Sequence, residues 1–405
     1  MRRFRGSRLA VLLTTALTVT GCATVVDGTA QPDPSAAVRL DTGGYPTAPR
    51  QVPERTDPND RRVQASYELS GHLIAPTEID AAYDWLASDA RTPVFPSLIG
   101  LTLQFGDFPA TALSAGDTFV GGAISARQTE AHGTAKADTP RMSTMLFRYR
   151  SAENAAGAVR GLKSLPAGTG SPLVGPPESF IGPAIDTVGL TTVWWAAVGD
   201  YLLGVGFASV PDADARGLAT RWMDRQVPEL AKITESAQQL LELPPDRDGV
   251  MSLTVPGTTR FQDGTQLTLG YLTPRAWGNS ANGRWSTKAA LFERAGVDLI
   301  GSAASIVYRT RDAAGARYLS DALNTPQPGI ELSNETDDQV VAAAPSGVPD
   351  ARCSSSTTRV TGDPRKAYSC ALIVGRYYIQ TDLVSTLTQA QQQAAASYLL
   401  VKDAK

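Results

Sequence analysis

Two stretches of the chain share one pattern: an apolar run, a two-residue turn containing glycine, and a second apolar run. The turns are Gly199-Asp200, between Thr192–Val198 and Tyr201–Ser209, and Gly375-Arg376, between Tyr368–Val374 and Tyr377–Val384. Such Gly-x turns between apolar runs are typical of tight β-hairpins. A predicted helix follows each hairpin. The chain is therefore expected to contain two related halves.

The repeat extends upstream of both hairpins. Tyr149-Arg150-Ser151 precedes an Ala-Ala-Gly-Ala phrase at 155–158, and Tyr308-Arg309-Thr310 precedes the same phrase at 313–316. Both are predicted strand-to-helix junctions, with Ser151 and Thr310 as expected N-caps. The shared order of strand, helix, hairpin and helix predicts an α+β fold. It would consist of two related ferredoxin-like units, each an antiparallel sheet with helices covering one face.

Periodicity and end signals place the remaining elements. The predicted strands are 119–126, 145–149, 266–272, 304–308 and 340–344. The predicted helices are 77–88, one starting at Ser151, 212–241 with a break at Pro228, 286–295 between Ser286 and Gly296 as caps, 312–323 and 388–402. The turn-rich segment Leu243–Gly249 divides an N-terminal domain, 61–243, from a C-terminal domain, 249–405.

The N-terminus has the features of an export signal. Four arginines lie within residues 2–8, and an uncharged, mostly apolar run follows from Leu9 to Thr20. That run is shorter than the roughly 20 residues a membrane-spanning helix needs. It is typical of a signal peptide, predicted here as residues 1–21.

Cys22 follows the signal directly, in Val19-Thr20-Gly21-Cys22. Small residues before such a cysteine resemble the bacterial lipobox, which implies cleavage before Cys22 and its diacylation, commonly with palmitate. The alternative is an ordinary secretory signal with a chance cysteine. Two acyl chains would anchor the protein to the outer face of the cell membrane without spanning it.

Residues 22–60, rich in Thr, Ala, Asp, Pro and Gly, are predicted to form a flexible tether behind the anchor. Within it, Asp41–Arg50 is more distinctive, and we expect that segment to pack against the folded body. Removing residues 1–21 deletes four arginines and no acidic residue, so the formal net charge changes from −3 to −7. An acidic chain without a basic run is a poor nucleic-acid binder.

Two further cysteines, Cys353 and Cys370, flank a Ser/Thr-rich segment. In an oxidising extracytoplasmic compartment such a pair is expected to form a disulfide. Two thiols without a nearby histidine make a metal site the weaker alternative.

Several phrases resemble a known family. These are the signal with its lipobox, Leu40–Thr47, Tyr271–Arg275 and Leu291–Asp298. They are similar to a two-domain secreted lipoprotein family of actinobacteria described only as a domain of unknown function. The resemblance implies the export address and the two-domain plan, and it assigns no functional residue.

The sequence carries no recognised catalytic motif. It has two histidines, His72 and His132, and neither accompanies a Gly-x-Ser-x-Gly elbow; a Walker loop, a zinc His-Glu-x-x-His motif and a Rossmann fingerprint are also missing. We therefore expect no catalytic residue, metal or cofactor. A catalytic pair of carboxylates, as in a glycosidase, remains an alternative, although no motif marks such a pair.

The aromatic residues are the remaining candidates for a binding site. Adjacent strand residues point to opposite faces, so of Trp194 and Trp195 one joins the core and the other lies under a helix or faces outward. An outward-facing tryptophan would form a ligand or partner surface together with Tyr201. Trp277 and Trp285 bracket a Gly/Asn-rich loop and would line a pocket mouth. The alternative for each is core or interdomain packing.

These observations favour a lipid-anchored, non-enzymatic binding protein for a small apolar or envelope-derived ligand or a protein partner, held in or near the cleft between the domains. The first alternative is a carboxylate-based envelope hydrolase. The second is a structural or scaffolding envelope protein, which predicts an exposed apolar patch.

Overall fold

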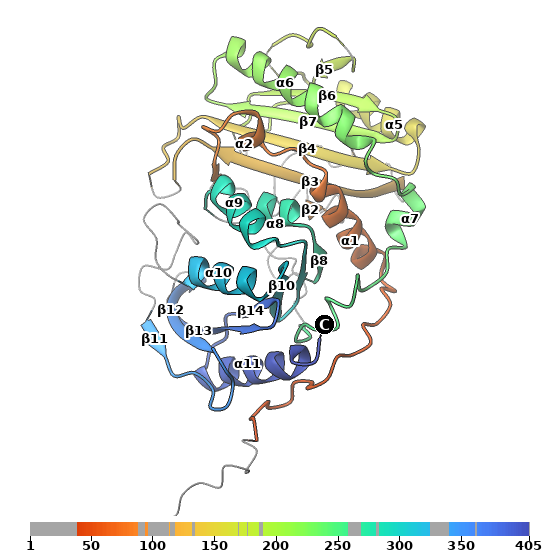
Figure 1. Cartoon of the computed structure of the whole chain (residues 1–405). Coiled ribbons are helices and arrows are strands. Elements are labelled where there is room, and N and C mark those ends of the chain that lie inside the picture. Colours follow the sequence, from red (N-terminus) through yellow and green to blue (C-terminus); the bar gives the residue numbers. More distant parts are fainter. Residues whose placement is uncertain are drawn as a thin grey trace, which may run out of the picture. The chain divides into compact units, whose positions relative to one another are not determined.

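The structure is a computed structural model (Figure 1) that describes residues 39–87, 94–95, 113, 118–131, 134–168, 170–175, 177–185, 189–257, 269–280, 283–324, 340–360 and 363–404. Within these ranges, residues 39–405 form one unit by their contacts. Cys22 and His132, together with the predicted signal peptide, lie outside the described residues.

The N-terminal half is built on a first antiparallel sheet with strand order β1-β3-β4-β7-β6-β5, and β2 also pairs with β3. The strands are β1 (Trp85–Leu86), β2 (Val94–Phe95), β3 (Phe119–Gln128), β4 (Arg141–Tyr149), β5 (Ser179–Ile181), β6 (Thr192–Val198) and β7 (Tyr201–Ala208).

The C-terminal half is built on a second antiparallel sheet with strand order β11-β12-β13-β14-β10-β9-β8. The strands are β8 (Gly270–Leu272), β9 (Leu299–Ser302), β10 (Ser305–Arg309), β11 (Val340–Ala342), β12 (Arg352–Val360), β13 (Asp363–Val374) and β14 (Tyr377–Thr381).

The two halves repeat one topology, as the sequence predicts. The order β1-β3-β4-β7-β6-β5 corresponds strand for strand to β8-β9-β10-β14-β13-β12. Both predicted hairpins are confirmed: β6–β7 turns at Gly199 and β13–β14 at Gly375, with φ of 57° and 56°. A positive φ at the turn explains why each hairpin carries glycine there.

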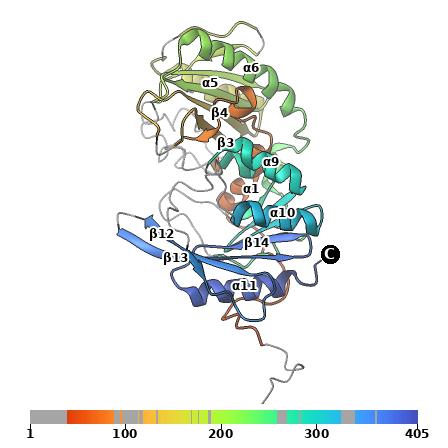
Figure 2. The same ribbon diagram turned by 60° about the vertical axis from the view of Figure 1, so that its left-hand side comes forward.

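The helices cover both faces of each sheet, which differs from the predicted one-sided cover. In the first sheet, α5 (Ala152–Lys163) packs in the cluster that contains Trp195, and α6 (Asp212–Leu230) packs in the cluster that contains Trp194. In the second sheet, α10 (Ala313–Asn324) and α11 (Leu387–Val401) likewise belong to different clusters and lie on opposite sides (Figures 1 and 2). Side chains alternate along a strand, so a sheet apolar on both faces needs cover on both.

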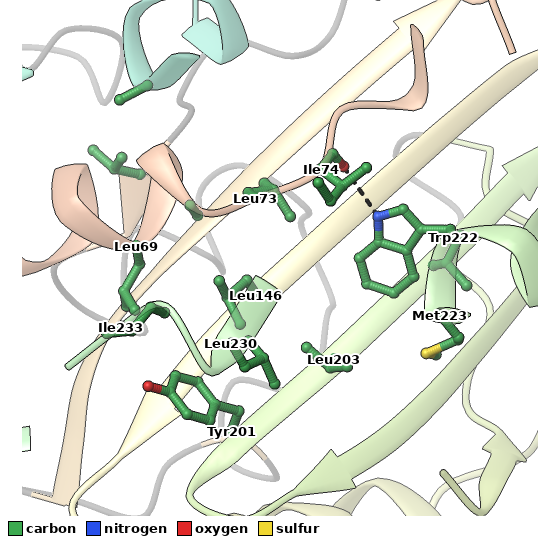
Figure 3. Packing of buried hydrophobic residues seen from close by; sticks show 14 of the residues in the cluster. Leu69, Leu73, Ile74, Leu146, Tyr201, Leu203, Trp222, Met223, Leu230 and Ile233 are labelled. Carbon is green, nitrogen blue, oxygen red and sulfur yellow. Dashed lines mark hydrogen bonds between the residues drawn. The ribbon is translucent and has the colours of Figure 1, made fainter. Parts of the chain in front are cut away.

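The larger cluster of the N-terminal half also uses a helix that the sequence patterns do not reveal, α1 (Pro58–Gly71). Figure 3 shows Leu69 of α1 with Leu146 and Leu203 of the sheet and Trp222 of α6, whose indole nitrogen donates to the Ile74 carbonyl at 3.0 Å. The weak apolar periodicity of α1 arises because polar side chains, including Gln64 and Ser66, are also buried.

The helix predicted over 77–88 is wrong beyond its first turn. Helix α2 (Pro76–Ile79) ends at Asp80, whose extended backbone breaks the helix, and residues 85–86 form β1 instead. The predicted long helix 212–241 is two helices, α6 and α7 (Ala237–Leu241). Pro228 lies in the last turn of α6, and Ser236 starts α7 with its own capping box.

The strand register aligns the two strand-to-helix junctions two residues differently from the Tyr-Arg-Ser and Tyr-Arg-Thr phrases. Arg148 pairs with Tyr201 after the first hairpin turn, and Arg309 pairs with Tyr377 after the second. Arg148 therefore corresponds to Arg309, and Ser151 corresponds to Asp312. Ser151 caps α5 by accepting from the Asn154 amide, as predicted. Thr310 is not the cap of α10: Asp312 accepts from the Gly315 amide at 2.8 Å.

The remaining helices of the C-terminal half are α8 (Pro274–Ser280) and α9 (Trp285–Ala295). Gly296 closes α9 with φ of 64°, as predicted. Ser286 is not its N-cap, because the helix starts one residue earlier.

Residues 39–52, within the predicted tether, contact the C-terminal half. Leu40, Tyr45 and Val52 pack against its core, the Tyr45 hydroxyl lies 3.2 Å from Gln389 Nε2, and Asp41 accepts from Gln392 at 3.0 Å. The expectation that Asp41–Arg50 packs on the body is confirmed. The disulfide Cys353–Cys370 is also confirmed, and it links directly opposite residues of β12 and β13.

Candidate functional site at the seam between the halves

Three of the five predicted binding aromatics lie in the core of the N-terminal half. Trp194 and Trp195 are both fully buried, on opposite faces of the sheet. The Trp194 indole donates to the Ser171 carbonyl, and Trp195 stacks on Phe147 with ring centroids 6.1 Å apart. Tyr201 is 7% exposed, with the Arg148 guanidinium 4.7 Å from its ring centroid. Neither tryptophan faces outward.

Trp277 and Trp285 lie apart from those three, on α8 and α9 of the C-terminal half. Trp277 packs against the core clusters of both halves and meets Tyr308 edge-on, with centroids 5.8 Å apart. Trp285 lies against Gly278, where an added Cβ would approach the indole nitrogen to 3.1 Å. Both are half-buried where the two halves meet.

That meeting zone, called the seam below, combines the apolar packing of Trp277 with polar contacts between two residue sets. The N-terminal half supplies Gln64, Glu78, Asp84, Arg127 and Glu229, and the C-terminal half supplies Tyr271, Arg275, Asn279, Arg284 and Ser286. None of these contacts follows from a local sequence motif, since the partners are far apart along the chain.

Asp84 holds the first turn of α9 from the other half. Its carboxylate is almost fully buried and accepts from the Arg284 Nε at 2.7 Å, the Ser286 amide at 2.8 Å and the Ser286 hydroxyl at 2.6 Å. Its carbonyl accepts from the Trp285 amide at 2.9 Å. A carboxylate at a helix N-terminus satisfies free amides and complements the helix dipole. Asp84 thus replaces the local cap that the sequence predicts at Ser286.

Two buried cations lie close to this contact. Arg127 of β3 donates to the carbonyls of Gly278 and Gly283, and burial lowers its pKa to about 9 although Asp84 opposes that shift. Burial and the charge of Arg127 lower the pKa of Lys288, on α9, to about 7. Lys288 lies two residues after Ser286, so the two side chains point to different sides of the helix. They do not form a serine–lysine catalytic pair.

A second cluster joins α2 and α6 to α8. Arg275 donates to Glu78 at 2.9 Å and to Glu229 at 3.3 Å, and Glu229 also binds Lys232 at 2.6 Å. His72 Nδ1 lies 3.4 Å from Glu229. Burial alone would raise the pKa of Glu229, but the Lys232 hydrogen bond and the Arg275 charge outweigh it and lower that pKa. A carboxylate with a lowered pKa, as Glu229 has, is unsuited to act as a general acid.

A third set of contacts ties α1 to β8 and α8. The Gln64 side chain donates to the Tyr271 carbonyl at 2.9 Å and accepts from the Tyr271 amide at 3.3 Å. Asn279 donates to the carbonyls of Ser70 and Leu73 at the end of α1. Through these contacts α1 joins the two halves.

Among the described residues, no group of three or more His, Cys, Asp or Glu side chains is arranged to hold a metal ion. Within the same ranges, no helix is long and apolar enough to cross a membrane. The seam arrangement positions helices and neutralises charge, and its chemistry is that of an interface within one body.

No curated protein matches the chain. Among solved structures it is similar to the extracellular domain of PknH from Mycobacterium tuberculosis, at 12% identity and a TM-score of 0.24, over 40% of this chain and 97% of that chain. Two family models match most of its length: Domain of unknown function (DUF7373) N-terminal over residues 52–245 and DUF7373 C-terminal over residues 259–404. The chain therefore belongs to the two-domain DUF7373 family, whose function is unknown.

Proposed function

We propose that the protein is a lipid-anchored, non-catalytic binding protein on the extracytoplasmic face of the cell membrane, and that it binds a protein partner through its surface. The predicted signal peptide and Cys22 support this extracytoplasmic, membrane-anchored location. The Cys353–Cys370 disulfide supports it independently, because disulfides persist in oxidising compartments.

The observation that carries the proposal is the position of the aromatic residues. A small-ligand site in a cleft between the domains would need Trp194, Trp195, Tyr201, Trp277 or Trp285 at its wall. The first three fill the core, and the other two pack in the seam, beside ion pairs that join the halves. These positions support a binding site on the outer surface over one in a cleft.

The hydrolase alternative receives less support. An acid–base carboxylate pair needs one group whose pKa is raised so that it holds a proton near neutral pH. The paired carboxylates of the seam, Glu78 and Glu229, share the Arg275 guanidinium, and the pKa of Glu229 is lowered.

Two measurements on the protein in its native envelope test the proposal. Replacing Cys22 with Ala should move the protein from the membrane fraction to the soluble fraction; full retention in the membrane contradicts the anchor. Native mass spectrometry of the unmodified protein, extracted from its envelope in mild detergent, should show the mass of the lipid-modified chain without a further small adduct. A discrete small mass that disappears on denaturation contradicts surface binding of a protein and indicates a ligand carrier.

A further inference from the structure

Residues 39–55, called the strap below, run along the C-terminal half before the chain enters the N-terminal half. Residues 39–52 pack against the core of the C-terminal half. Arg55 then donates to the carbonyls of Pro244 and Pro245, in the segment that joins the halves. Helix α1 begins only after this contact. The strap therefore fixes the chain to the C-terminal half first, although it precedes the N-terminal half in sequence.

The turn at the start of the strap is shaped to fit α11. The Tyr45 amide donates to the Thr42 carbonyl at 3.1 Å, and the Gly43 amide donates to Asp41 at 3.0 Å. Gly43 has φ of 54°, and an added Cβ there would lie 2.7 Å from the Gln392 side chain. A side chain at this position would strain the turn and push it away from the helix.

Three glutamines of α11 hold this turn. Gln389 and Gln393 donate to the Tyr45 hydroxyl at 3.2 and 3.3 Å. Gln392 donates to the Asp41 carboxylate at 3.0 Å. Residues three and four apart share one side of a helix, so the three glutamines form a single row toward the strap. The polar row and the apolar packing together make the strap a fixed part of the C-terminal half.

The docked strap leaves a short length of chain behind Cys22. Seventeen peptide units separate Cys22 from Arg39, and thirty-three separate Cys22 from Arg55. At about 3.3–3.6 Å per residue, these lengths span at most about 60 Å and about 120 Å. Docking therefore halves the reach of an anchor at Cys22, and it moves the point of attachment from the start of α1 to the side of α11.

Helix α11 and the helices of the first sheet lie at opposite ends of the body. Figures 1 and 2 both show α11 at one end and α5 and α6 at the other, with α9 between them. An anchored chain that leaves the body beside α11 brings that end to the membrane first. The end that carries α5 and α6 is then the farther one.

We propose that the docked strap orients the protein, so that the α11 side of the C-terminal half faces the lipid surface and the N-terminal half is displayed away from it. The inference rests on the proposed function, and it specifies that the N-terminal half is the part of the surface that a partner protein reaches freely. With the strap undocked, the body would be attached at α1, which contacts both halves, and would lose this orientation.

The test couples the mature chain, residues 22–405, to phosphatidylcholine vesicles that contain a maleimide lipid and an acceptor lipid for fluorescence energy transfer. The sequence has three cysteines, and Cys353 and Cys370 form the disulfide, so Cys22 supplies the thiol for coupling. The link is chemical, and the outcome therefore does not depend on whether Cys22 is acylated in the cell.

A fluorescent amino acid is placed in one half or the other. Leu383, before α11, is 52% exposed, and Val174, in a loop whose Pro172 carbonyl accepts from Arg216 of α6, is 95% exposed. Energy transfer to the acceptor lipid should be at least threefold more efficient from position 383 than from position 174. A smaller ratio overturns the proposal.

A strap variant tests the cause of the orientation. G43V/Y45A removes the fit of the turn to α11 and the hydroxyl that the glutamines hold, and should lower the ratio at least twofold. The matched control is G44A/T47A, at a glycine with open space around it and an exposed threonine of the same strap, which should keep the ratio. Equal ratios for the two variants overturn the role of the strap.

A second variant keeps the strap intact. C22S/N59C moves the thiol to an exposed position in the first turn of α1 and should also lower the ratio at least twofold; an unchanged ratio overturns the proposal. The fractionation of C22A separates the two levels of the account. Membrane retention of C22A contradicts the proposed function, whereas release of C22A with a low ratio on vesicles contradicts this inference alone.

Discussion

The N- and C-terminal halves share a strand order but reach it with different local chemistry. The cap of the helix after β4 is Ser151, and the cap of the helix after β10 is Asp312. The glycines of the two Ala-Ala-Gly-Ala phrases also differ: Gly157 has space beside it, whereas a Cβ at Gly315 would lie 2.2 Å from the Ala295 carbonyl. The comparison shows that topology is repeated while individual contacts are not, so function need not be repeated either.

The largest expected effect concerns the contact between Asp84 of the N-terminal half and the first turn of α9 in the C-terminal half. Replacing Asp84 with Ala leaves Arg284 and the first amides of α9 without their partner and should lower the free energy of unfolding by about 3–5 kcal/mol. Chemical denaturation measures it. The control is D298A, whose carboxylate is half exposed in its pair with Arg309 and should cost at most about 1 kcal/mol. Equal small losses for both variants contradict the role of Asp84.

The two glycines provide the next comparison. G315A forces α10 away from the Ala295 carbonyl and should destabilise by about 1–3 kcal/mol. G157A adds a better helix former where space exists and should stabilise by about 0.5–1 kcal/mol. Opposite signs in thermal denaturation are the expected outcome, and the same sign for both variants refutes the structural difference between the halves.

The caps give a smaller effect. S151A and D312A should each cost about 1 kcal/mol, because each removes the acceptor for a helix-start amide. Thr310 does not cap α10, because its hydroxyl donates to the carbonyls of Asp312 and Arg376. Unchanged stability of D312A in chemical denaturation contradicts the revised match between the halves.

The smallest effect is a pH dependence. The folded-state pKa of Glu229 is lowered, so its contribution to stability is present above the unfolded-state pKa and is lost as the pH falls through the folded-state value. Arg275 keeps Glu78 as a partner, so E229Q should cost less than about 1 kcal/mol at pH 7 and should flatten the loss of stability in acid. E153Q, at an exposed site of α5, should leave the acid profile unchanged. An unchanged profile for E229Q contradicts this assignment.

Much of the fold follows from local sequence signals. Glycine at the turns identified both hairpins, Ser151 and Gly296 marked helix ends, and the two cysteines proved to be cross-strand neighbours. The helix expected at 77–88 stops at Asp80, whose backbone is extended. Asp84, further along, binds the start of a helix about 200 residues away, and a carboxylate used at long range looks locally like a helix-favouring acid. The Ala-Ala-Gly-Ala phrases align residues 155–158 with residues 313–316. The strand register aligns the same helices three residues differently.

Less of the candidate site than of the fold could be predicted from the sequence. Aromatic pairs such as Trp194-Trp195 indicate a sheet with two buried faces as readily as a binding surface, and the structure has the former. The roles of the seam residues, among them Arg127 and Arg275, depend on partners in the other half of the chain.

The seam is a permanent part of one folded body, and for this reason we propose a binding site on the surface. Differential scanning calorimetry of the mature chain tests this permanence most directly. The account predicts a single transition whose calorimetric and van't Hoff enthalpies agree, with two resolved transitions appearing only when Asp84 and Arg275 are both replaced by Ala. Two transitions in the unmodified protein would show that the halves unfold separately, and would contradict the claim.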